Sequence, residues 1–135
     1  MIEVSIIILS YNTSDLLKDC LSSLYKNTNG VNFEVIVVDN NSQDNSLEMV
    51  EKNFPKVLLV KNNENLGFAA GNNSAKRVAK GKYVLFLNSD TIVNEDTIKK
   101  SVYYLEQNKD IGALTCKVVL KNGQLDPDTR RSFPT

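Results

Sequence analysis

Amide and carboxylate side chains close a long apolar run in the second half of the chain. The run covers residues 83–87 and is followed by Asn88, Ser89 and Asp90. Carboxylate and carbonyl oxygens are hard ligands that suit Mg²⁺ or Mn²⁺, ions that keep several waters and are commonly shared with a bound diphosphate. The stretch therefore predicts a metal-nucleotide site in which Asp90 binds the ion. The alternative is a polar turn that only ends a core strand.

Two other apolar runs end in the same way. Residues 4–9 lead into the polar turn 10–12, and residues 33–38 lead into Asp39. Such runs are typical of parallel strands buried on both faces, and we expect the same of residues 83–87. Parallel strands present their carboxyl ends at one edge of the sheet, where ligands bind in open α/β folds. The three turns should therefore converge on a single ligand.

Helix signals separate these runs. The alternation of strands and helices predicts one α/β domain, a three-layer sandwich with a mainly parallel central sheet. The Asn122-Gly123 pair predicts a type I′ hairpin turn after a strand at residues 113–120. The other expected elements are a helix capped by Thr13 or Ser14 and ending near Asn29, a second helix capped by Ser42 or Asp44 and ending near Asn53, a strand at residues 57–60, a third helix opening at residues 67–71 and running toward Ala79, and a fourth helix capped by Asn94.

The composition narrows the chemistry. The chain has 135 residues, of which 41% are hydrophobic, as expected for one soluble globular domain or a piece of one. Lys plus Arg and Asp plus Glu both number 16, so a nucleic-acid partner is not expected. The chain contains no histidine, which excludes Ser-His and Cys-His nucleophile pairs. The general base is therefore expected to be a carboxylate.

The cysteines and the N-terminus point to a reducing compartment. Cys20 and Cys116 cannot form a four-thiolate zinc site, and we expect two reduced core thiols rather than a disulfide. The first residues lack a basic leader and an apolar core long enough for a signal peptide or a membrane span. A cytoplasmic location is expected.

Four segments resemble family 2 glycosyltransferases and occur in that family's order. The segments are residues 4–12, residues 37–42 with Asp44 and Ser46 after them, residues 65–68, and residues 88–90. The resemblance spans nearly the whole chain. It implies the GT-A form of a Rossmann-like α/β sandwich and an inverting, metal-dependent transfer of a sugar from a nucleoside diphosphate to an acceptor hydroxyl, with Mg²⁺ or Mn²⁺ as cofactor.

The resemblance also implies a role for each matching residue. Asp39 would recognise a pyrimidine base, and Asp90 would be the metal-binding carboxylate of the family's Asp-x-Asp motif. Asn88 replaces the first Asp of that motif, so one negative charge is missing and metal affinity should be weaker. Asn41 stands where Gly is common, which is acceptable because Asn tolerates a positive φ. The remaining implied site residues are Ser10, Tyr11 and Asn12 in the nucleoside pocket, Asn65, Gly67 and Phe68 in the loop over the donor, and Ser89 in the metal turn.

Two features are similar to the rhamnosyltransferase-like branch of the family, whose donors are dTDP-sugars. They are the Asn-x-Asp form of the metal motif and residues 130–135, Arg-Arg-Ser-Phe-Pro-Thr. A UDP-sugar is the other expected donor, and the acceptor would be a glycan or a lipid-linked molecule. The family's general base lies in the second half of the catalytic domain, beyond Thr135. We therefore expect a donor-binding part that binds nucleotide weakly and does not turn over alone, within a longer enzyme acting in the cytoplasm or at the inner face of the membrane.

Other functions fit the residues less well. A sugar-nucleotide pyrophosphorylase would carry a Gly-rich loop with Arg and Lys after the first strand, and a receiver-like module would carry an acidic pair there, whereas residues 10–13 are Ser-Tyr-Asn-Thr. A Rossmann dehydrogenase would need a glycine spacing that residues 67–71 lack. Individual residues also have structural alternatives. They are packing at the sheet edge for Tyr11, a hydrophobic plug for Phe68, helix capping for Asp39 and Asp44, and a solvated surface for Arg130 and Arg131.

Overall fold

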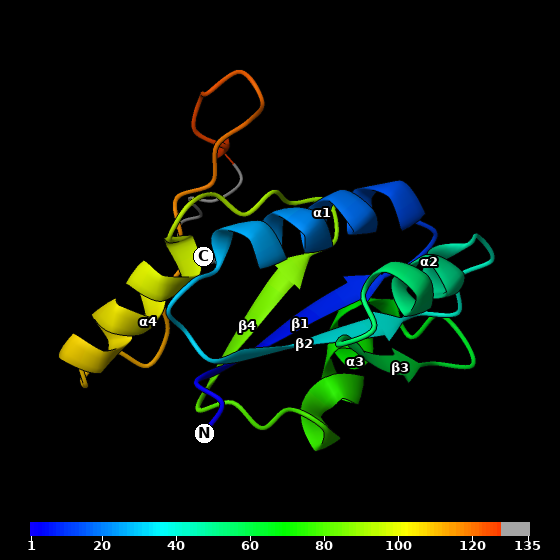
Figure 1. Cartoon of the computed structure of the whole chain (residues 1–135), viewed down its shortest axis with the longest axis horizontal. Helices are drawn as coiled ribbons and strands as arrows, with labels where there is room; N and C mark the ends of the chain where they lie inside the picture. Colours follow the sequence, from blue (N-terminus) through cyan, green and yellow to red (C-terminus); the bar gives the residue numbers. More distant parts are fainter. Residues whose placement is uncertain (128–135) are drawn as a thin grey trace, which may run out of the picture.

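A four-stranded parallel sheet forms the centre of the molecule, in the strand order β3-β2-β1-β4 (Figure 1). The computed structural model describes residues 1–127. The strands are β1 (Val4–Ser10), β2 (Phe33–Asp39), β3 (Leu58–Lys61) and β4 (Tyr83–Asn88). The α/β fold with a parallel sheet is thus confirmed, and β3 lies one residue later than expected.

The register of the sheet brings the polar strand ends together. Ser10 at the end of β1 pairs with Asp39 at the end of β2, and Leu9 pairs with Asn88 at the end of β4. Because all the strands are parallel, their carboxyl ends lie at one edge. The prediction that the three polar turns meet at this edge is confirmed at the level of the backbone.

Helices cover both faces of the sheet, which gives the expected three layers. Helices α1, α2 and α4 contribute to a core cluster on one face, while η1 packs on the other face, next to α3. Asp96, with a left-handed φ of 58°, is the cap of α4 and lies two residues after the cap expected at Asn94. The helical elements are α1 (Ser14–Asn27), α2 (Ser46–Asn53), α3 (Gly67–Asn73), the 3₁₀ helix η1 (Ser74–Arg77) and α4 (Thr97–Gln107).

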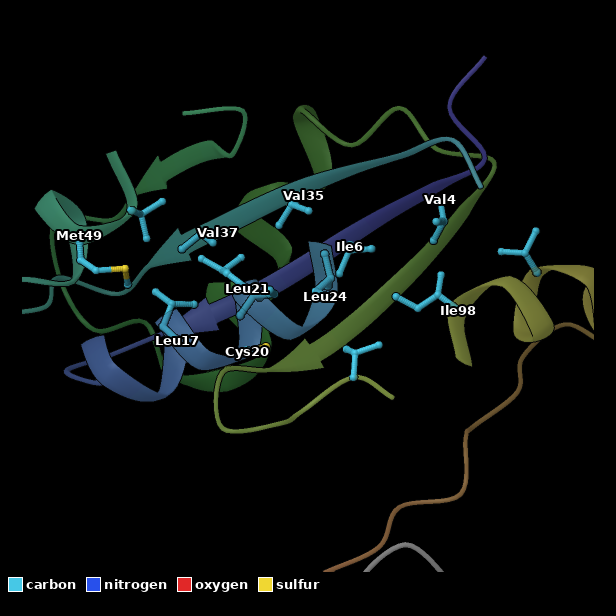
Figure 2. Close-up of a cluster of buried hydrophobic side chains, with 14 residues drawn as sticks. Val4, Ile6, Leu17, Cys20, Leu21, Leu24, Val35, Val37, Met49 and Ile98 are labelled. Carbon is cyan, nitrogen blue, oxygen red and sulfur yellow. The ribbon is translucent and has the colours of Figure 1, made fainter. Parts of the chain in front are cut away.

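The larger core cluster lies between α1 and the sheet. Leu17, Leu21 and Leu24 of α1 are fully buried and point toward Ile6 of β1 and its neighbours on β2 (Figure 2). Their spacing of three and four residues places them on one helix face. This packing fixes the position of the first turn of α1 next to the polar turn that follows β1.

The strand β4 corrects one expectation. Residues 83–87 were expected to be buried on both faces, but Val84 and Phe86 are 49% and 56% exposed, whereas Leu85 and Leu87 pack against the larger core cluster. β4 is an edge strand within residues 1–127. An apolar run alone does not reveal whether its second face is covered by another element.

The segment after α4 also differs from expectation. Residues 113–120 form no strand, and only an isolated antiparallel bridge joins Val119 to Leu125. Gly123 has a φ of +81°, but the φ of Asn122 is not positive. A type I′ turn needs a positive φ at both central residues, so this turn is not type I′. The third helix was expected to run toward Ala79, but α3 ends at Asn73 and is followed by η1. The reason is that Gly and Asn are weak helix formers.

Two further observations concern the cysteines and membrane spans. Cys20 and Cys116 are both free thiols, the first fully buried and the second only partly buried. Among residues 1–127, no helix combines the length and the apolarity needed to cross a bilayer.

Candidate functional site

A cavity of about 370 Å³ opens at the carboxyl edge of the sheet. Its size is in the range typical of small-molecule sites. The turn after β1, the first turns of α1 and α3, and the turn after β4 all contribute to it. The lining residues are Leu9, Tyr11, Thr13, Leu16, Phe68, Asn88, Ser89 and Asp90.

Half of the residues predicted for the site line this cavity. Tyr11 and Phe68 are 46% and 64% exposed there and offer two aromatic rings, and the turn 88–90 supplies the polar wall. The other predicted residues lie at the same sheet edge without lining the cavity. They are Ser10, Asn12, Asp39, Asn65 and Gly67.

A chain of hydroxyl groups connects the turns on either side of the cavity. The Ser10 and Thr13 hydroxyls are 2.9 Å apart, and the Thr13 hydroxyl donates to Ser89 Oγ at 3.2 Å. Thr13 was expected only as a helix cap, and its side chain makes no capping bond. The cavity-lining positions of Thr13 and Leu16 were not predicted from the sequence. Their place at the start of a helix directly after Tyr11 is the signal that could have indicated them.

Cys20 of α1 is hydrogen-bonded to the turn that carries Asp90. The thiol of Cys20 donates to the carbonyl of Asn88 at 3.7 Å, and the Thr91 hydroxyl donates to the same carbonyl at 2.8 Å. Burial is the largest influence on the Cys20 thiol, and it raises its pKa. A protonated thiol is therefore available as a donor to the Asn88 carbonyl.

The Asp39 carboxylate is buried and only half satisfied. Asp39 is 2% exposed, and its Oδ2 accepts the Ser42 N–H at 3.0 Å. Its Oδ1 has no hydrogen-bond partner. Among the buried side-chain oxygen and nitrogen atoms of residues 1–127, only the Thr28 hydroxyl also lacks one. An unsatisfied buried acceptor costs about 1–3 kcal/mol, so this oxygen would gain from a ligand donor.

Asn12 joins the turns after β1 and β2. Its N–H donates to Ser42 Oγ at 3.0 Å, and its Oδ1 accepts the Gln43 N–H at 2.7 Å. Asn12 and Asn41 both have left-handed φ values, 54° and 68°. The expectation that Asn41 occupies a glycine-like conformation is confirmed. The contacts of Asn12 join the two turns to each other.

Asp44 bonds to the starts of two helices, whereas the structural alternative predicted only a cap for the second. Its Oδ2 accepts the Ser14 N–H at the start of α1, and its Oδ1 accepts the Ser46 N–H at the start of α2, both at 3.0 Å. Partial burial acts to raise the pKa of Asp44, but hydrogen bonds from the Ser46 hydroxyl and the two N–H groups outweigh it and lower that pKa. The carboxylate therefore ties the two helix starts together in its ionised form.

Asp44→Ala is expected to lower the free energy of unfolding by about 1 kcal/mol at neutral pH, a modest loss because solvent screens the exposed carboxylate. A carboxylate whose pKa is lowered on folding contributes stability that is complete above its ordinary pKa of 3.8 and is lost as pH falls through the folded value. The difference between Asp44→Ala and the unsubstituted chain should thus shrink below about pH 4. Urea denaturation at several pH values measures it, with exposed Asp110→Ala as control. A difference that grows on acidification would contradict this role.

The ligands available to a metal ion are few. Asp90 and Asn88 are exposed at the cavity, and no group of three or more Cys, Asp and Glu side chains within residues 1–127 could hold an ion. The donor set is one carboxylate and one amide oxygen. It fits a hard cation that takes its other ligands from water and a bound diphosphate.

A larger cavity of about 590 Å³ lies at the opposite edge of the sheet, beside α4. Glu3, Gly30 and Val31, which precede β1 and β2, line it together with residues of α4 such as Lys99 and Tyr103. Ligands of open parallel sheets bind at the carboxyl edge, where the smaller cavity is found. We therefore assign the functional site to the smaller cavity.

Arg130 and Arg131, together with the remaining residues of the segment 130–135, lie outside the described residues. The similarity of that segment to one branch of the family consequently has no structural counterpart here.

Comparison with known proteins agrees with the site. Curated relatives include a poly(ribitol-phosphate) beta-glucosyltransferase of Bacillus spizizenii, 32% identical over 79% of this chain and 18% of the relative. Another is the UDP-Glc:alpha-D-GlcNAc-diphosphoundecaprenol beta-1,3-glucosyltransferase WfaP of Escherichia coli, 33% identical over 78% of this chain and 42% of the relative. The chain thus spans less than half the length of these relatives.

Solved structures share the fold. S. aureus TarS residues 1–349 in complex with UDP-GlcNAc superimposes with a TM-score of 0.73 and 31% identity, over 80% of this chain and 32% of that one. The mannosyltransferase PcManGT of Pyrobaculum calidifontis, in complex with GDP-Man and Mn²⁺, gives a TM-score of 0.71 and 29% identity, over 76% and 32%. Residues 5–133 match the profile of Glycosyl transferase family 2, and the chain belongs to that family.

Proposed function

We propose that this chain binds the nucleotide-sugar donor of a glycosyltransferase. The observation that carries the proposal is one cavity lined by the turn after β1, the start of α3 and the turn after β4. Its wall contains the aromatic rings of Tyr11 and Phe68 and the Asn88–Asp90 turn. Aromatic faces suit a nucleobase, and oxygen ligands suit the ion that accompanies a diphosphate. TarS with UDP-GlcNAc and PcManGT with GDP-Man, which share the fold, are complexes with nucleotide sugars.

The base of the donor is a pyrimidine in this proposal. Tyr11 presents its ring to one face of the base, and Asp39 Oδ1 accepts the ring N–H that a uracil or thymine base offers. Because Asp39 is 2% exposed, the base reaches that oxygen only after a local rearrangement at the sheet edge. UDP-sugars and dTDP-sugars both meet the requirement. The dTDP donors of the rhamnosyltransferase-like branch remain a prediction from Asn88 and residues 130–135.

The proposed reaction is a displacement with inversion. An acceptor hydroxyl attacks the anomeric carbon of the donor sugar, the bond from that carbon to the diphosphate breaks, and a carboxylate takes the hydroxyl proton. Asp90 and Asn88 would hold a divalent ion, which would supply charge stabilisation to the departing diphosphate. This chain binds and orients the donor, and the acceptor is a glycan or a lipid-linked molecule.

The proton acceptor belongs to further polypeptide in this proposal. The outer face of β4, where Val84 and Phe86 are exposed, is an apolar surface of the kind that another element covers. The relatives are more than twice as long as the part that this chain matches. Both observations support a donor-binding part that does not turn over by itself.

Calorimetric titration with UDP, dTDP and GDP, each with and without Mn²⁺, tests the proposal. The chain is expected to bind UDP or dTDP more tightly with Mn²⁺ than without it. Asp90→Ala should weaken binding about tenfold in the presence of Mn²⁺ and change it little in its absence, because the lost carboxylate contributes only through the ion.

Glu95→Ala serves as the matched control, since it removes an exposed carboxylate five residues after Asp90 that does not line the cavity. It should leave every titration unchanged. Binding that is independent of Mn²⁺ and survives Asp90→Ala would remove the role assigned to Asp90. Failure of all three nucleotides to bind would refute the proposed function and leave the fold intact.

A further inference from the structure

We propose that Asn40 is a positioning residue that holds the loop 62–67, and with it Phe68, over the donor cavity. The expected effect of Asn40 on nucleotide binding rests on the proposed function. Asn40 follows β2, is 2% exposed and does not line the cavity. Its effect on a donor therefore acts through the residues it holds.

The side-chain amide of Asn40 is fully used by the loop. Its Nδ2 donates to Asn65 Oδ1 at 2.9 Å and to the Gly67 carbonyl at 3.2 Å. Its Oδ1 accepts from Asn62 Nδ2 at 3.0 Å and from the Leu66 N–H at 3.2 Å. An amide has two donor hydrogens and two acceptor lone pairs, so its hydrogen-bonding capacity is saturated.

These bonds connect the loop to the ends of two strands. The Asn40 N–H donates to the Ser10 carbonyl at 2.9 Å, and the Asn62 N–H donates to the Asp39 carbonyl at 2.9 Å. The helix α3 passes close to the same point, because a Cβ on Gly71, its fifth residue, would lie 2.7 Å from Leu9 Cδ1 and 3.2 Å from Asn40 Nδ2. The loop and α3 are thus fixed against β1 and β2.

Phe68 depends on this arrangement. It is the second residue of α3, it lines the cavity, and at 64% exposure it has little packing of its own to hold it. Its position follows from the backbone that begins at Gly67, whose carbonyl and N–H are bonded to Asn40 and Asn65. Releasing the loop from Asn40 would leave the Phe68 ring free to move away from the donor.

Asparagine is the residue type that this site requires. Aspartate has the same shape, but an ionised carboxylate has no hydrogen to donate and would place a negative oxygen against Asn65 Oδ1 and the Gly67 carbonyl. Asn65 cannot turn its amide to compensate, because its Oδ1 also accepts the Gly67 N–H at 2.9 Å. Asn40→Asp therefore breaks the two donor bonds without changing the volume.

Tryptophan fluorescence tests the inference. The chain contains no tryptophan, so Phe68→Trp introduces a single indole at the cavity. In that background, Asn40→Asp is expected to raise acrylamide quenching of the indole in the free, folded protein. It should also weaken UDP or dTDP binding about tenfold or more, since a repelled pair and two lost bonds exceed ~1.4 kcal/mol.

Asn41→Asp is the matched control. It adds the same charge one residue further on, at an exposed position whose left-handed φ of 68° suits aspartate. It should leave both quenching and affinity unchanged, which separates loop positioning from repulsion between the new charge and a diphosphate. Circular dichroism shows whether each variant is folded.

The outcomes distinguish this inference from the proposed function. Unchanged quenching in folded Asn40→Asp protein overturns the positioning role, even where nucleotide still binds. Raised quenching in a chain that binds no nucleotide supports the positioning role while the proposed function fails. If Asn40→Asp does not fold, Asn65→Ala removes the same bond from the exposed loop; raised quenching there supports the inference and unchanged quenching overturns it.

Discussion

Asp39→Asn is expected to weaken the binding of UDP or dTDP by about 100-fold while leaving the fold intact. The proposed contact is an acceptor bond from Asp39 Oδ1 to the N–H of a pyrimidine base. Asparagine retains one oxygen for the Ser42 N–H, which Asp39 Oδ2 accepts at 3.0 Å, and turns an NH₂ group toward the base N–H. Two donors then face each other inside a buried site, and the charge that strengthened the bond is gone.

Calorimetric titration measures the affinity, and urea denaturation should show a free energy of unfolding within about 1 kcal/mol of the unsubstituted chain. Asp19→Asn, on the exposed face of α1, is the control and should change neither quantity. GDP binding should be less affected than UDP binding, because guanine is a larger, bicyclic base whose ring N–H lies further from the ribose than that of a pyrimidine. Equal losses of affinity for UDP and GDP would show that Asp39 does not discriminate between the bases. An unchanged UDP affinity would show that Asp39 is not part of the binding site.

Gly81→Ala should produce the largest loss of stability, about 3 kcal/mol or more. A Cβ at Gly81 would lie 2.3 Å from the backbone nitrogen of Ser5 and 2.7 Å from the carbonyl carbon of Val4. Both atoms belong to β1, the central strand, so neither can move aside as a flexible side chain would. The Gly81 N–H also donates to Ser5 Oγ at 2.7 Å, a bond that the required shift would break.

Thermal or urea denaturation measures the loss. Gly112→Ala is the matched control, because a Cβ at Gly112 has no neighbour within 4 Å and its φ is not in the left-handed range. It should leave stability unchanged or raise it by up to about 1 kcal/mol through the reduced freedom of the unfolded chain. A loss at Gly81 below about 1 kcal/mol would mean that the close approach to β1 relaxes easily.

Much of the fold was predictable because its signals are local. Leu17, Leu21 and Leu24 recur at helical spacing and do form the buried face of α1. The apolar run of β1 was correctly read as a buried central strand. The same kind of run in β4 was misread, since the exposure of Val84 and Phe86 on its outer face depends on which other elements pack there, and the run itself does not encode them. The turn at Asn122 was also misread, because Asn-Gly permits more than one turn type.

The candidate site shows the same division. Tyr11 and Asp90 could be predicted as neighbours, because residues that follow the carboxyl ends of parallel strands meet at one edge whatever the detailed packing. Phe68 was implied only by the family resemblance. Thr13 and Leu16 could not be assigned in this way, since their place in the cavity depends on the direction of α1. Asn40 stands within a run of amides where nothing local separates a buried, saturated side chain from exposed neighbours such as Asn41.

The sequence by itself determined the order of strands and helices and the family motifs that follow the strands. These depend on side-chain periodicity and on residue types a few positions apart. Only the tertiary structure decided which polar groups are satisfied: Asp44 is bonded to two helix starts, Asn40 to four groups of one loop, and Asp39 retains a free buried oxygen. The physical reason is that a hydrogen bond requires two groups within about 3 Å, whereas the loop partners of Asn40 lie 22–27 positions away along the chain and Ser14 lies 30 positions from Asp44.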